Sequence, residues 1–382
     1  MRKRKTRKRV KFVILIFFLI LIGFIGIRVW KYLSIGLQVV TNKNIELKQT
    51  PEKRVNILLL GVGGGNHEGP DLTDTVIFAS IDPQTKNTLL VTLPRDIWIP
   101  EMSAKINTAY IYGEEKKKGG GLLMAKAMVG KVLGQDIDYA IKIHFDGFSK
   151  AVDELGELDV SVDNTFDDYA YPITGKQDDA CGHSETEVAS LSAQLASASA
   201  DLTELDAFPC RYEHIHFDKG PVHMSGAETL KFVRSRHALG SEGSDFARSR
   251  RQAKIITAIK DKVFSLGMLL NPGKALDLID VIKGSIATDI KEDEYDDFIR
   301  LAEKFKSSTI TSASLDTGDS ETSRVGLLTN PTNTEEYERA WVLIPAAGNG
   351  DYSEILKYVD CEINKAKCSN VPTGFDKGKV IE

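Results

Sequence analysis

An arginine-rich block is the strongest chemical signal in this sequence. Between Phe232 and Gln252, in the stretch FVRSRHALGSEGSDFARSRRQ, stand five arginines and no lysine. A guanidinium group is planar, stays charged, and offers paired donors that match the oxygens of a phosphate. Residues 1–11 hold eight of the 49 Lys and Arg, so residues 12–382 carry 41 basic against 54 acidic residues, a balance of −13. A dense arginine block in an acidic domain predicts one particular anionic ligand, and the acidic balance argues against nucleic acid as a partner.

The spacing of the arginines predicts that two helix ends converge on this ligand. A capping-box pattern at Ser225 and Glu228 indicates a helix that runs to about His237, and Asp245 is a suitable N-cap for a second helix. Side chains three or four positions apart share a helix face, whereas side chains two apart do not. The donors predicted to meet a pyrophosphate are Arg234, Arg236, Arg248, Arg251 and Gln252. On spacing alone, a set of surface ion pairs with the many acidic residues is an equally good interpretation.

Two shorter motifs follow predicted strands and offer complementary chemistry. Gly61–Asp74, with the sequence GVGGGNHEGPDLTD, is neither a Walker loop nor a dinucleotide-binding fingerprint. Its Asp71 and Asp74 offer oxygen ligands for a hard cation such as Mg²⁺, although a glycine-rich loop with a turn-capping Asp is the simpler interpretation. Arg95 and Asp96 end the third strand, where an arginine is well placed to meet a leaving phosphate. A surface Arg–Asp pair is the alternative for this motif.

The elements that must position these residues alternate between strand and helix patterns. We expect strands at 55–61, 75–81, 87–93, 139–145 and 158–162, helices at 119–134 and 147–155, and a last strand at 341–344 followed by a helix at 352–359. This order predicts an α/β fold with a mixed central sheet flanked by helices on both faces. Residues 167–216, which contain the low-complexity run ASLSAQLASASADL, are expected to form a surface insertion.

The N-terminus predicts a membrane anchor. A basic tail at 1–11 precedes the apolar run at 12–27, which Val29 and Trp30 extend to a span of 12–30. The positive-inside rule places the tail in the cytoplasm and the rest outside it, in a single-pass protein of the cell membrane. A cleaved signal peptide is the alternative, but no A-x-A cleavage site follows the run.

Cysteine usage agrees with an extracytoplasmic domain. All four cysteines follow the predicted anchor, and an even number outside the cytoplasm predicts two disulfides. The simplest of the three possible connectivities pairs Cys181 with Cys210 and Cys361 with Cys368. The predicted organisation is then a linker at 31–53, a catalytic domain at 54–310, and a C-terminal region at 311–382 that completes or flanks the domain.

Taken together in order and spacing, the motifs resemble those of the LytR-CpsA-Psr family of bacterial envelope proteins. The segments that carry the resemblance are LLLGVGGG, DLTDTVIFASIDP, VTLPRDIWIP, KINTAY and VRSRHALGSEGSDFARSRRQ, which lie within residues 54–310. The resemblance implies a membrane-anchored, Mg²⁺-dependent (or Mn²⁺-dependent) phosphotransferase. Such an enzyme moves a glycopolymer from a polyprenyl pyrophosphate carrier to peptidoglycan.

The resemblance also assigns roles to the matching positions. Asp74, with Asp71, is expected to hold the metal ion, and Arg95 to assist cleavage of the pyrophosphate. Asp96 and Asp245 are the two candidates for the general base. The residues expected to bind the pyrophosphate are Arg234, Arg236, Arg248, Arg251 and Gln252. The lipid is expected in an apolar groove with its pyrophosphate at the mouth.

One departure from the family pattern concerns the metal. The family usually carries a metal-binding Asp where this chain has Gly63, so Asp71 or His67 is expected to replace it. This departure keeps two other functions open: a regulator that binds a polyprenyl phosphate without turnover, and a pyrophosphatase that uses water as the acceptor.

Overall fold

The computed structural model describes residues 45–64, 69, 71–195, 202–265, 272–319, 324–364 and 380–381. The described chain divides into two compact units. The smaller unit comprises residues 45–48 and 290–304 and includes most of helix α11 (Tyr295–Lys306), in which Arg300 pairs with Asp296 and Asp297. All further elements belong to the larger unit, which contains every described residue of the candidate site. The predicted anchor at 12–30 lies outside the described residues.

A seven-stranded mixed sheet forms the centre of the larger unit. Its strand order is β11-β6-β1-β2-β3-β12-β17. Strand β2 is antiparallel to both of its neighbours, β1 and β3, whereas β6 pairs with β1, and β12 with β3, in parallel. The bounds are β1 (Val55–Val62), β2 (Thr73–Asp82), β3 (Asn87–Leu93), β6 (Tyr139–His144), β11 (Ile286–Thr288), β12 (Thr309–Ser314) and β17 (Val380–Ile381). The sequence predicts a mixed sheet, as observed. Strand β12 extends past residue 310, the predicted end of the domain.

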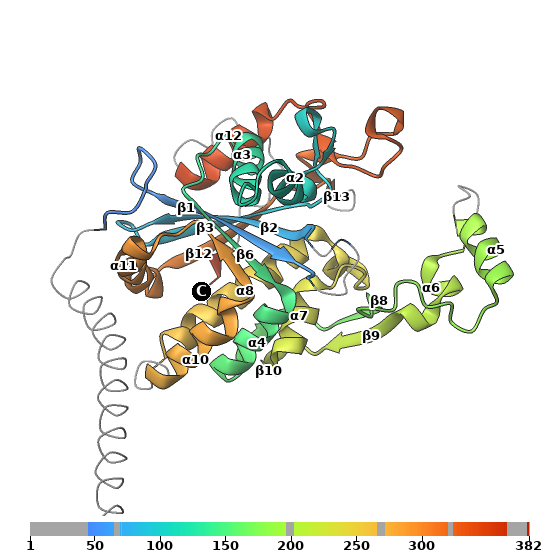
Figure 1. Cartoon of the computed structure of the whole chain (residues 1–382), viewed down its shortest axis with the longest axis horizontal. Helices are drawn as coiled ribbons and strands as arrows, with labels where there is room; N and C mark the ends of the chain where they lie inside the picture. The colour runs from blue at the N-terminus through green and yellow to red at the C-terminus, as the bar shows by residue number, and fades with distance from the viewer. Residues whose placement is uncertain are drawn as a thin grey trace, which may run out of the picture. The chain divides into compact units, whose positions relative to one another are not determined.

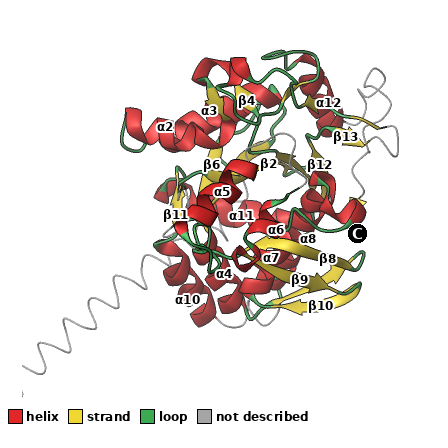
Figure 2. Cartoon of the chain, turned by 90° about the vertical axis from the view of Figure 1, so that its right-hand side faces the viewer, coloured by secondary structure: helices red, strands yellow, loops and turns green. Residues whose placement is uncertain are grey.

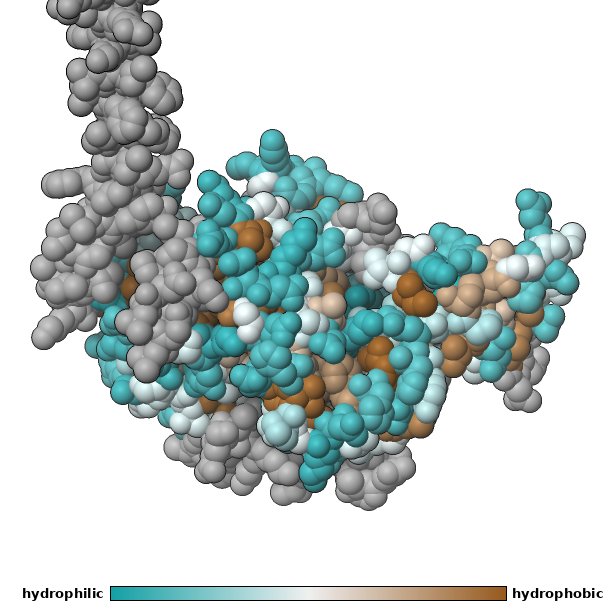
Figure 3. All heavy atoms as spheres, turned by 90° about the horizontal axis from the view of Figure 1, so that it is seen from below, coloured by the Kyte–Doolittle hydropathy of each residue, from teal (hydrophilic) through white to brown (hydrophobic). Residues whose placement is uncertain are grey.

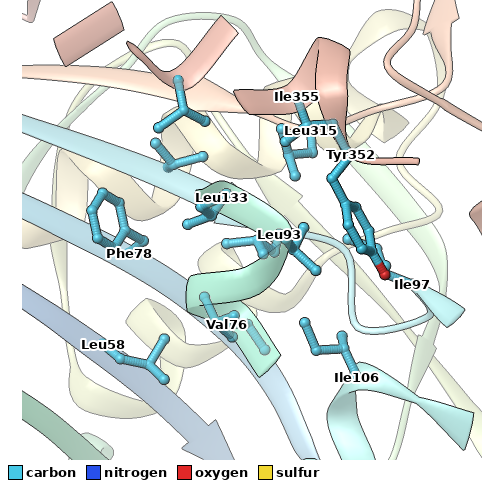
Figure 4. Packing of buried hydrophobic residues seen from close by; sticks show 14 of the residues in the cluster. Leu58, Val76, Phe78, Leu93, Ile97, Ile106, Leu133, Leu315, Tyr352 and Ile355 are labelled. Carbon is cyan, nitrogen blue, oxygen red and sulfur yellow. The ribbon is translucent and has the colours of Figure 1, made fainter. Parts of the chain in front are cut away.

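One face of the sheet packs against helices α2 (Ala109–Lys116), α3 (Gly121–Leu133) and α12 (Ser353–Asn364), which lie above the sheet in Figure 1. Alternate strand residues such as Leu58, Val76 and Phe78 point to this side and join Leu133 and Ile355 in the main hydrophobic core (Figure 4). The period-two alternation of apolar residues along the strands produces this core directly.

Four other helices lie below the sheet in Figure 1. They are α4 (Phe145–Leu155), α7 (Gly226–Arg234), α8 (Asp245–Val263) and α10 (Pro272–Lys283). Three of them pack against the opposite face of the sheet, and α10 packs on α4. Helices on both faces explain why the central strands are apolar throughout, since neither face meets water. The surface seen from this side is largely hydrophilic, with hydrophobic residues in separate patches (Figure 3).

Residues 167–216 are only partly an insertion. Strands β8 (Phe166–Pro172) and β9 (Tyr212–Phe217) pair with each other, and β7 (Leu158–Val162) pairs with β10 (Gly220–Met224) (Figure 2). The prediction of a surface insertion over the whole range was therefore wrong at both ends, because Tyr171 on β8 and Ile215 on β9 are buried in a second core. Only the residues between β8 and β9 extend as an arm, with α5 (Glu185–Leu195) and α6 (Glu204–Ala207) (Figure 1).

The arm is closed by the predicted disulfide between Cys181 and Cys210. The predicted pairing of Cys361 with Cys368 involves a residue outside the described part of the chain. The remaining short strands are β4 (Trp98–Ile99), β5 (Ala104–Lys105), β13 (Gly318–Asp319), β14 (Arg324–Val325), β15 (Leu328–Thr329) and β16 (Ile344–Pro345). Among the described helices, none is long and apolar enough to cross a membrane.

Candidate functional site

A charged cavity of about 180 Å³ opens where the ends of β2 and β3 meet the ends of α7 and α8. It brings together most of the predicted site residues from three separate parts of the sequence. The lining residues are Asp74, Thr75, Arg95, Phe145, Tyr171, Pro172, Val233, Arg234, Arg236, His237, Arg248 and Gln252. Among the described lining residues there are four arginines and one aspartate, which makes the cavity strongly cationic and suited to a multiply charged anion.

Strand pairing sets the contact between Asp74 and Arg95. Strands β2 and β3 are antiparallel, and Val76 lies opposite Leu93, so the start of one strand adjoins the end of the other. Arg95 Nη1 donates to Asp74 Oδ1 at 2.5 Å. Burial lowers the pKa of the Arg95 guanidinium, but the carboxylates of Asp74 and Asp96 outweigh this effect and raise the pKa above its usual value. Arg95 is therefore a fixed positive charge at the cavity wall.

Asp96 contacts the Arg95 guanidinium and does not line the cavity. It is 8% exposed, accepts a hydrogen bond from Lys105 Nζ at 2.8 Å, and lies 3.6 Å from Arg95 Nε. Its carboxylate contacts both of these cations, and Asp96 is not among the described residues that line the cavity. This surrounding disagrees with the expectation that Asp96 acts as a general base, and it points to a positioning role.

Asp71, which is predicted to hold a metal ion together with Asp74, makes its ion pair outside the lining of the charged cavity. Asp71 pairs with Lys142 Nζ at 3.1 Å. That ammonium group lies 4.2 Å from the centre of the Tyr110 ring, on the side of the sheet covered by α2. Asp71 is not among the described residues that line the cavity with Asp74. His67 lies outside the described residues.

Helix α7 ends earlier than predicted, and this change brings two arginines together. The capping box of Ser225 and Glu228 is present, but the helix ends at Arg234 and the next residues are extended. In extended chain, residues two apart point to the same side, whereas in a helix they do not. Arg234 and Arg236 therefore both line the cavity, although the sequence-based helix to His237 separated them.

Asp168 on β8 explains the early end of the helix. It is fully buried, and its Oδ2 accepts hydrogen bonds from Ser235 Oγ at 2.7 Å and from the backbone N–H groups of Arg236 and His237, each at 3.2 Å. These bonds replace the helical bonds that the two N–H groups would otherwise make. No pattern in the sequence marked this residue, because it stands within the range read as an insertion.

Aromatic side chains hold the Arg234 guanidinium. Its carbon lies 4.6 Å from the ring centre of Phe145 and 5.9 Å from that of Tyr171, and Nη1 reaches the Tyr171 hydroxyl at 3.5 Å. Such cation–π contacts orient an arginine without using its donors on another charge. Burial raises the pKa of Tyr171, although Arg234 opposes the shift, so the hydroxyl stays protonated at neutral pH. Sequence reasoning missed both aromatic residues.

Helix α8 presents Arg248 and Gln252 to the cavity, as their spacing of four predicts. Gln252 is fixed by a hydrogen bond that its Oε1 accepts from Thr92 Oγ1 at 3.3 Å. The N-cap of this helix is Ser244, whose side chain accepts from the N–H of Ala247, so the prediction of Asp245 as N-cap was wrong by one residue. The side chain of Asp245 lies outside the described part of the chain.

The Arg251 guanidinium bonds to other groups of the protein and does not line the cavity, which disagrees with the prediction that it binds phosphate. Its guanidinium is buried and donates to the carbonyls of Phe232, Ser235 and Glu242 and to the Glu242 carboxylate, at 2.8–3.1 Å. Burial lowers the pKa of Arg251 to about 10, with Glu242 opposing the shift. All these donors are used inside the protein, so Arg251 ties α8 to the end of α7.

An apolar cavity of about 220 Å³ adjoins the charged one, between the sheet and helices α4, α7 and α8. It is lined by Leu59, Leu60, Gly61, Thr75, Ile77, Ile141, Ile143, Phe145, Phe148, Leu230, Val233, Gln252, Ile255, Ile256 and Ile259. Thr75, Phe145, Val233 and Gln252 line both cavities. A Cβ atom on Gly61 would lie 2.9 Å from Phe145 Cε1, so glycine permits the close packing at this junction.

The chain matches the model of the LytR_cpsA_psr family over residues 36–338. It is 28% identical over 254 residues to the polyisoprenyl-teichoic acid–peptidoglycan teichoic acid transferase TagU of Bacillus cereus, a match that covers 65% of this chain and 64% of that protein. The chain is also 23% identical over 350 residues to TagV of Bacillus subtilis, which has the same transferase name. This match covers 88% of this chain and 75% of that protein.

Solved structures share the fold. Protein gbs0355 from Streptococcus agalactiae superposes with a TM-score of 0.52 at 18% identity, covering 86% of this chain and 93% of that one. A protein described as a transcriptional regulator from Enterococcus faecalis superposes with a TM-score of 0.51 at 19% sequence identity. The match covers 82% of this chain and 89% of that one.

Proposed function

The chain belongs to the LytR-CpsA-Psr family, and from this premise we propose that it is a phosphotransferase that moves a glycopolymer from a polyprenyl pyrophosphate carrier to peptidoglycan. The main support is the junction of a cavity lined by four arginines with an apolar cavity. A polyprenyl pyrophosphate likewise carries a highly charged pyrophosphate group directly beside an apolar lipid chain, so each part of it matches one cavity. The names of the TagU and TagV relatives support a transferase of this class.

The arginine cavity binds the pyrophosphate in this proposal. Arg234 ends α7, Arg236 follows it, and Arg248 stands on α8, while Arg95 approaches from the end of β3. Guanidinium groups compensate charge best where they are already oriented before the ligand arrives. Phe145 and Tyr171 orient Arg234, Asp74 and Asp96 orient Arg95, and Asp168 fixes the backbone of Arg236.

The apolar cavity binds the first part of the lipid. Transferring apolar surface out of water contributes about 0.8 kcal/mol for each buried CH₂ group. The phosphate end of the lipid then lies beside Gln252 and Thr75, which line both cavities. Binding of the lipid thereby places the pyrophosphate among the arginines.

Mg²⁺, or Mn²⁺ in its place, fits the charged cavity through Asp74. Mg²⁺ in proteins often uses one or two carboxylates, together with substrate phosphates and water. Asp74 is the carboxylate that lines the cavity among the described residues, and the pyrophosphate supplies further oxygens. When bound, the cation would neutralise charge on the phosphates.

The reaction exchanges one phosphorus–oxygen bond for another. A sugar hydroxyl of peptidoglycan attacks the phosphorus that bears the glycopolymer, the anhydride bond between the two phosphates breaks, and polyprenyl phosphate leaves. Arg95 stabilises the negative charge that develops on the leaving phosphate. Asp245, at the first position of α8, is our candidate for accepting the hydroxyl proton, because Asp96 is held between Lys105 and Arg95.

A reconstituted transfer reaction tests this proposal. The full-length protein in detergent is incubated with a polyprenyl pyrophosphate-linked oligosaccharide and peptidoglycan fragments, with Mg²⁺ or with EDTA. The expected result is a glycan–peptidoglycan phosphodiester formed only with the metal ion. Release of phosphate without joined product would instead indicate the pyrophosphatase, and tight lipid retention without release would indicate the binding regulator.

We further propose that residues 12–30 anchor the protein in the cell membrane with the basic tail at 1–11 in the cytoplasm. The apolar run and the asymmetric charge support this arrangement. Protease added to intact spheroplasts should then degrade the domain and leave an N-terminal tag protected. Protection of the domain would contradict the orientation.

A further inference from the structure

A second polar cluster lies on the β8–β9 hairpin, apart from the charged cavity. Asp167 Oδ1 is 2.8 Å from His214 Nε2 and 2.8 Å from His216 Nδ1. The three potential ligand atoms all lie within 4.8 Å of one another. We propose that Asp167, His214 and His216 form a binding site for a divalent transition-metal ion, with Zn²⁺ as the best fit.

Sheet geometry explains why these three side chains meet. His214 and His216 are two apart on β9, so they point to the same face. Asp167 on β8 lies directly opposite His216 in the antiparallel register. All three side chains are partly exposed, between 31% and 45%, so an ion and its water ligand can reach them. The pairing of the strands holds the ligands in place before any metal binds.

The surroundings of both histidines resemble those of metal ligands. His216 directs Nδ1 at the site, and its other nitrogen, Nε2, lies 3.3 Å from Asp218 Oδ1. A carboxylate on the outer nitrogen fixes the orientation of a metal-bound imidazole and raises its basicity. The His214 ring stacks on Tyr169, with centroids 4.1 Å apart and an interplanar angle of 5°, which restricts its rotation.

The ligand types select the class of metal. Two imidazole nitrogens and one carboxylate oxygen suit Zn²⁺ or a similar ion, with water in a fourth position. Mg²⁺ prefers an all-oxygen set, so this site is chemically distinct from the one at Asp74. A second candidate cluster contains Asp179 with Cys181 and Cys210, but these cysteines form the disulfide and offer no thiolate.

The site would cross-link the base of the arm next to the arginine cavity. The carbonyl of Asp167 accepts from the N–H of Leu239, and the neighbouring Asp168 holds the backbone of Arg236 and His237. A metal ion at Asp167 therefore joins β8 and β9 where they support the arginine segment. We expect it to stabilise the hairpin against unfolding, since a ligand that binds only the folded state raises the melting temperature.

Isothermal titration of tag-free, EDTA-treated full-length protein with ZnCl₂ tests the site. The expected result is one saturable Zn²⁺ per chain, undiminished by excess Mg²⁺, and a higher melting temperature with Zn²⁺. His214→Ala combined with His216→Ala should abolish binding, and Asp218→Asn should weaken it about 10-fold or more. Zn²⁺ binding that persists unchanged in the double variant, or no saturable binding at all, would overturn the proposal.

A matched control comes from His223 on β10. It also contacts two carboxylates, those of Asp159 and Glu157, each at 2.7 Å, but it has no second imidazole in the cluster. His223→Ala should therefore leave Zn²⁺ binding unchanged, and loss of binding there would contradict the assignment. If the double variant fails to fold, Co²⁺ bound to the native protein provides a further test. Visible absorption typical of four-coordinate nitrogen and oxygen ligands is expected, and an octahedral aqua spectrum would refute the site.

Discussion

The two adjoining cavities of the larger unit are built by different means. The apolar cavity is lined by residues of neighbouring strands and of helices α4, α7 and α8, such as Leu59, Ile77 and Ile255. The charged cavity depends on further side chains around it that hold its cations in place: aromatic rings beside Arg234 and carboxylates beside other arginines. Its arginines depend on Asp96, Asp168 and, indirectly, Glu242. Apolar surface tolerates small displacements, whereas paired donors to a phosphate do not.

This difference predicts that the two cavities respond differently to substitution. The charged cavity should lose function when a single donor or its support is removed. The apolar cavity should lose only its preference for long lipids. The following variants test this contrast, from the largest expected effect to the smallest.

Removing a cavity arginine should have the largest effect. Arg95→Ala removes a cation from the developing charge on the leaving phosphate, and the rate of transfer should fall about 10²–10³-fold, as for the loss of a preorganised donor. Lipid binding through the apolar cavity should be much less affected. The transfer assay and a lipid-binding assay are run together on the same protein.

Arg250→Ala is the matched control. Arg250 belongs to the same sequence block but points to Glu242 Oε1 at 3.0 Å and does not line the cavity. Transfer should stay within about 3-fold of the wild-type rate, the scale of a surface ion pair. An Arg95→Ala enzyme as active as this control would refute the role given to Arg95.

Removing the support at Asp168 should have the next largest effect. Asp168→Ala leaves the donors of Ser235, Arg236 and His237 without their buried acceptor, at a cost of about 1–3 kcal/mol in the free energy of unfolding. The affinity for pyrophosphate should fall about 10-fold or more as Arg236 moves. Asp168→Asn retains one acceptor oxygen and should recover part of the affinity. Equal affinities in both variants would point to a purely structural role.

Filling the apolar cavity should change substrate preference rather than catalysis. Ile256→Trp places a larger side chain in the cavity lining. The rate with a long polyprenyl substrate should fall about 10-fold, while a short-chain pyrophosphate should react at nearly the wild-type rate. The reason is that only the long chain extends into the part of the cavity that the Trp side chain occupies. Rates measured with both substrates provide the check. An equal loss with both would show that the two cavities do not act separately.

Removing the disulfide that closes the arm should have the smallest effect on activity. Replacing both Cys181 and Cys210 with Ser removes a cross-link that spans 29 residues of sequence. The chain-entropy model gives at most about 3–4 kcal/mol of stability for such a loop. Proteolysis between residues 173 and 211 should accelerate, while transfer stays within about 2-fold. A large loss of transfer would instead assign the arm a part in the reaction.

Much of the fold was predictable from the sequence because it depends on local patterns. The continuous apolar runs predicted β1, β2 and β3 to within about two residues, and the capping box located the start of α7. The mixed sheet with helices on both faces followed from the order of these elements. The spacing of Arg248 and Gln252 on α8 predicted their shared face correctly. Helical and strand periodicities are properties of consecutive residues, so one sequence suffices to read them.

The parts that were wrong depend on contacts between distant residues. Nothing near Arg251 in the sequence shows that its donors are used by carbonyls at the end of α7. Nothing near Asp71 shows that it pairs with Lys142 and does not line the cavity with Asp74. The end of α7 itself depends on Asp168, which is more than 60 residues away in the sequence.

The sequence by itself thus determined which residue types are available and on which elements they stand: an arginine block, an aspartate and an arginine at strand ends, and apolar strands between helices. Only the tertiary structure decided which arginines face the ligand and which brace the protein. The physical reason is that a guanidinium group has the same charge and donors in both roles. Its role is set by the acceptors that surround it, and folding brings those acceptors from elsewhere in the chain.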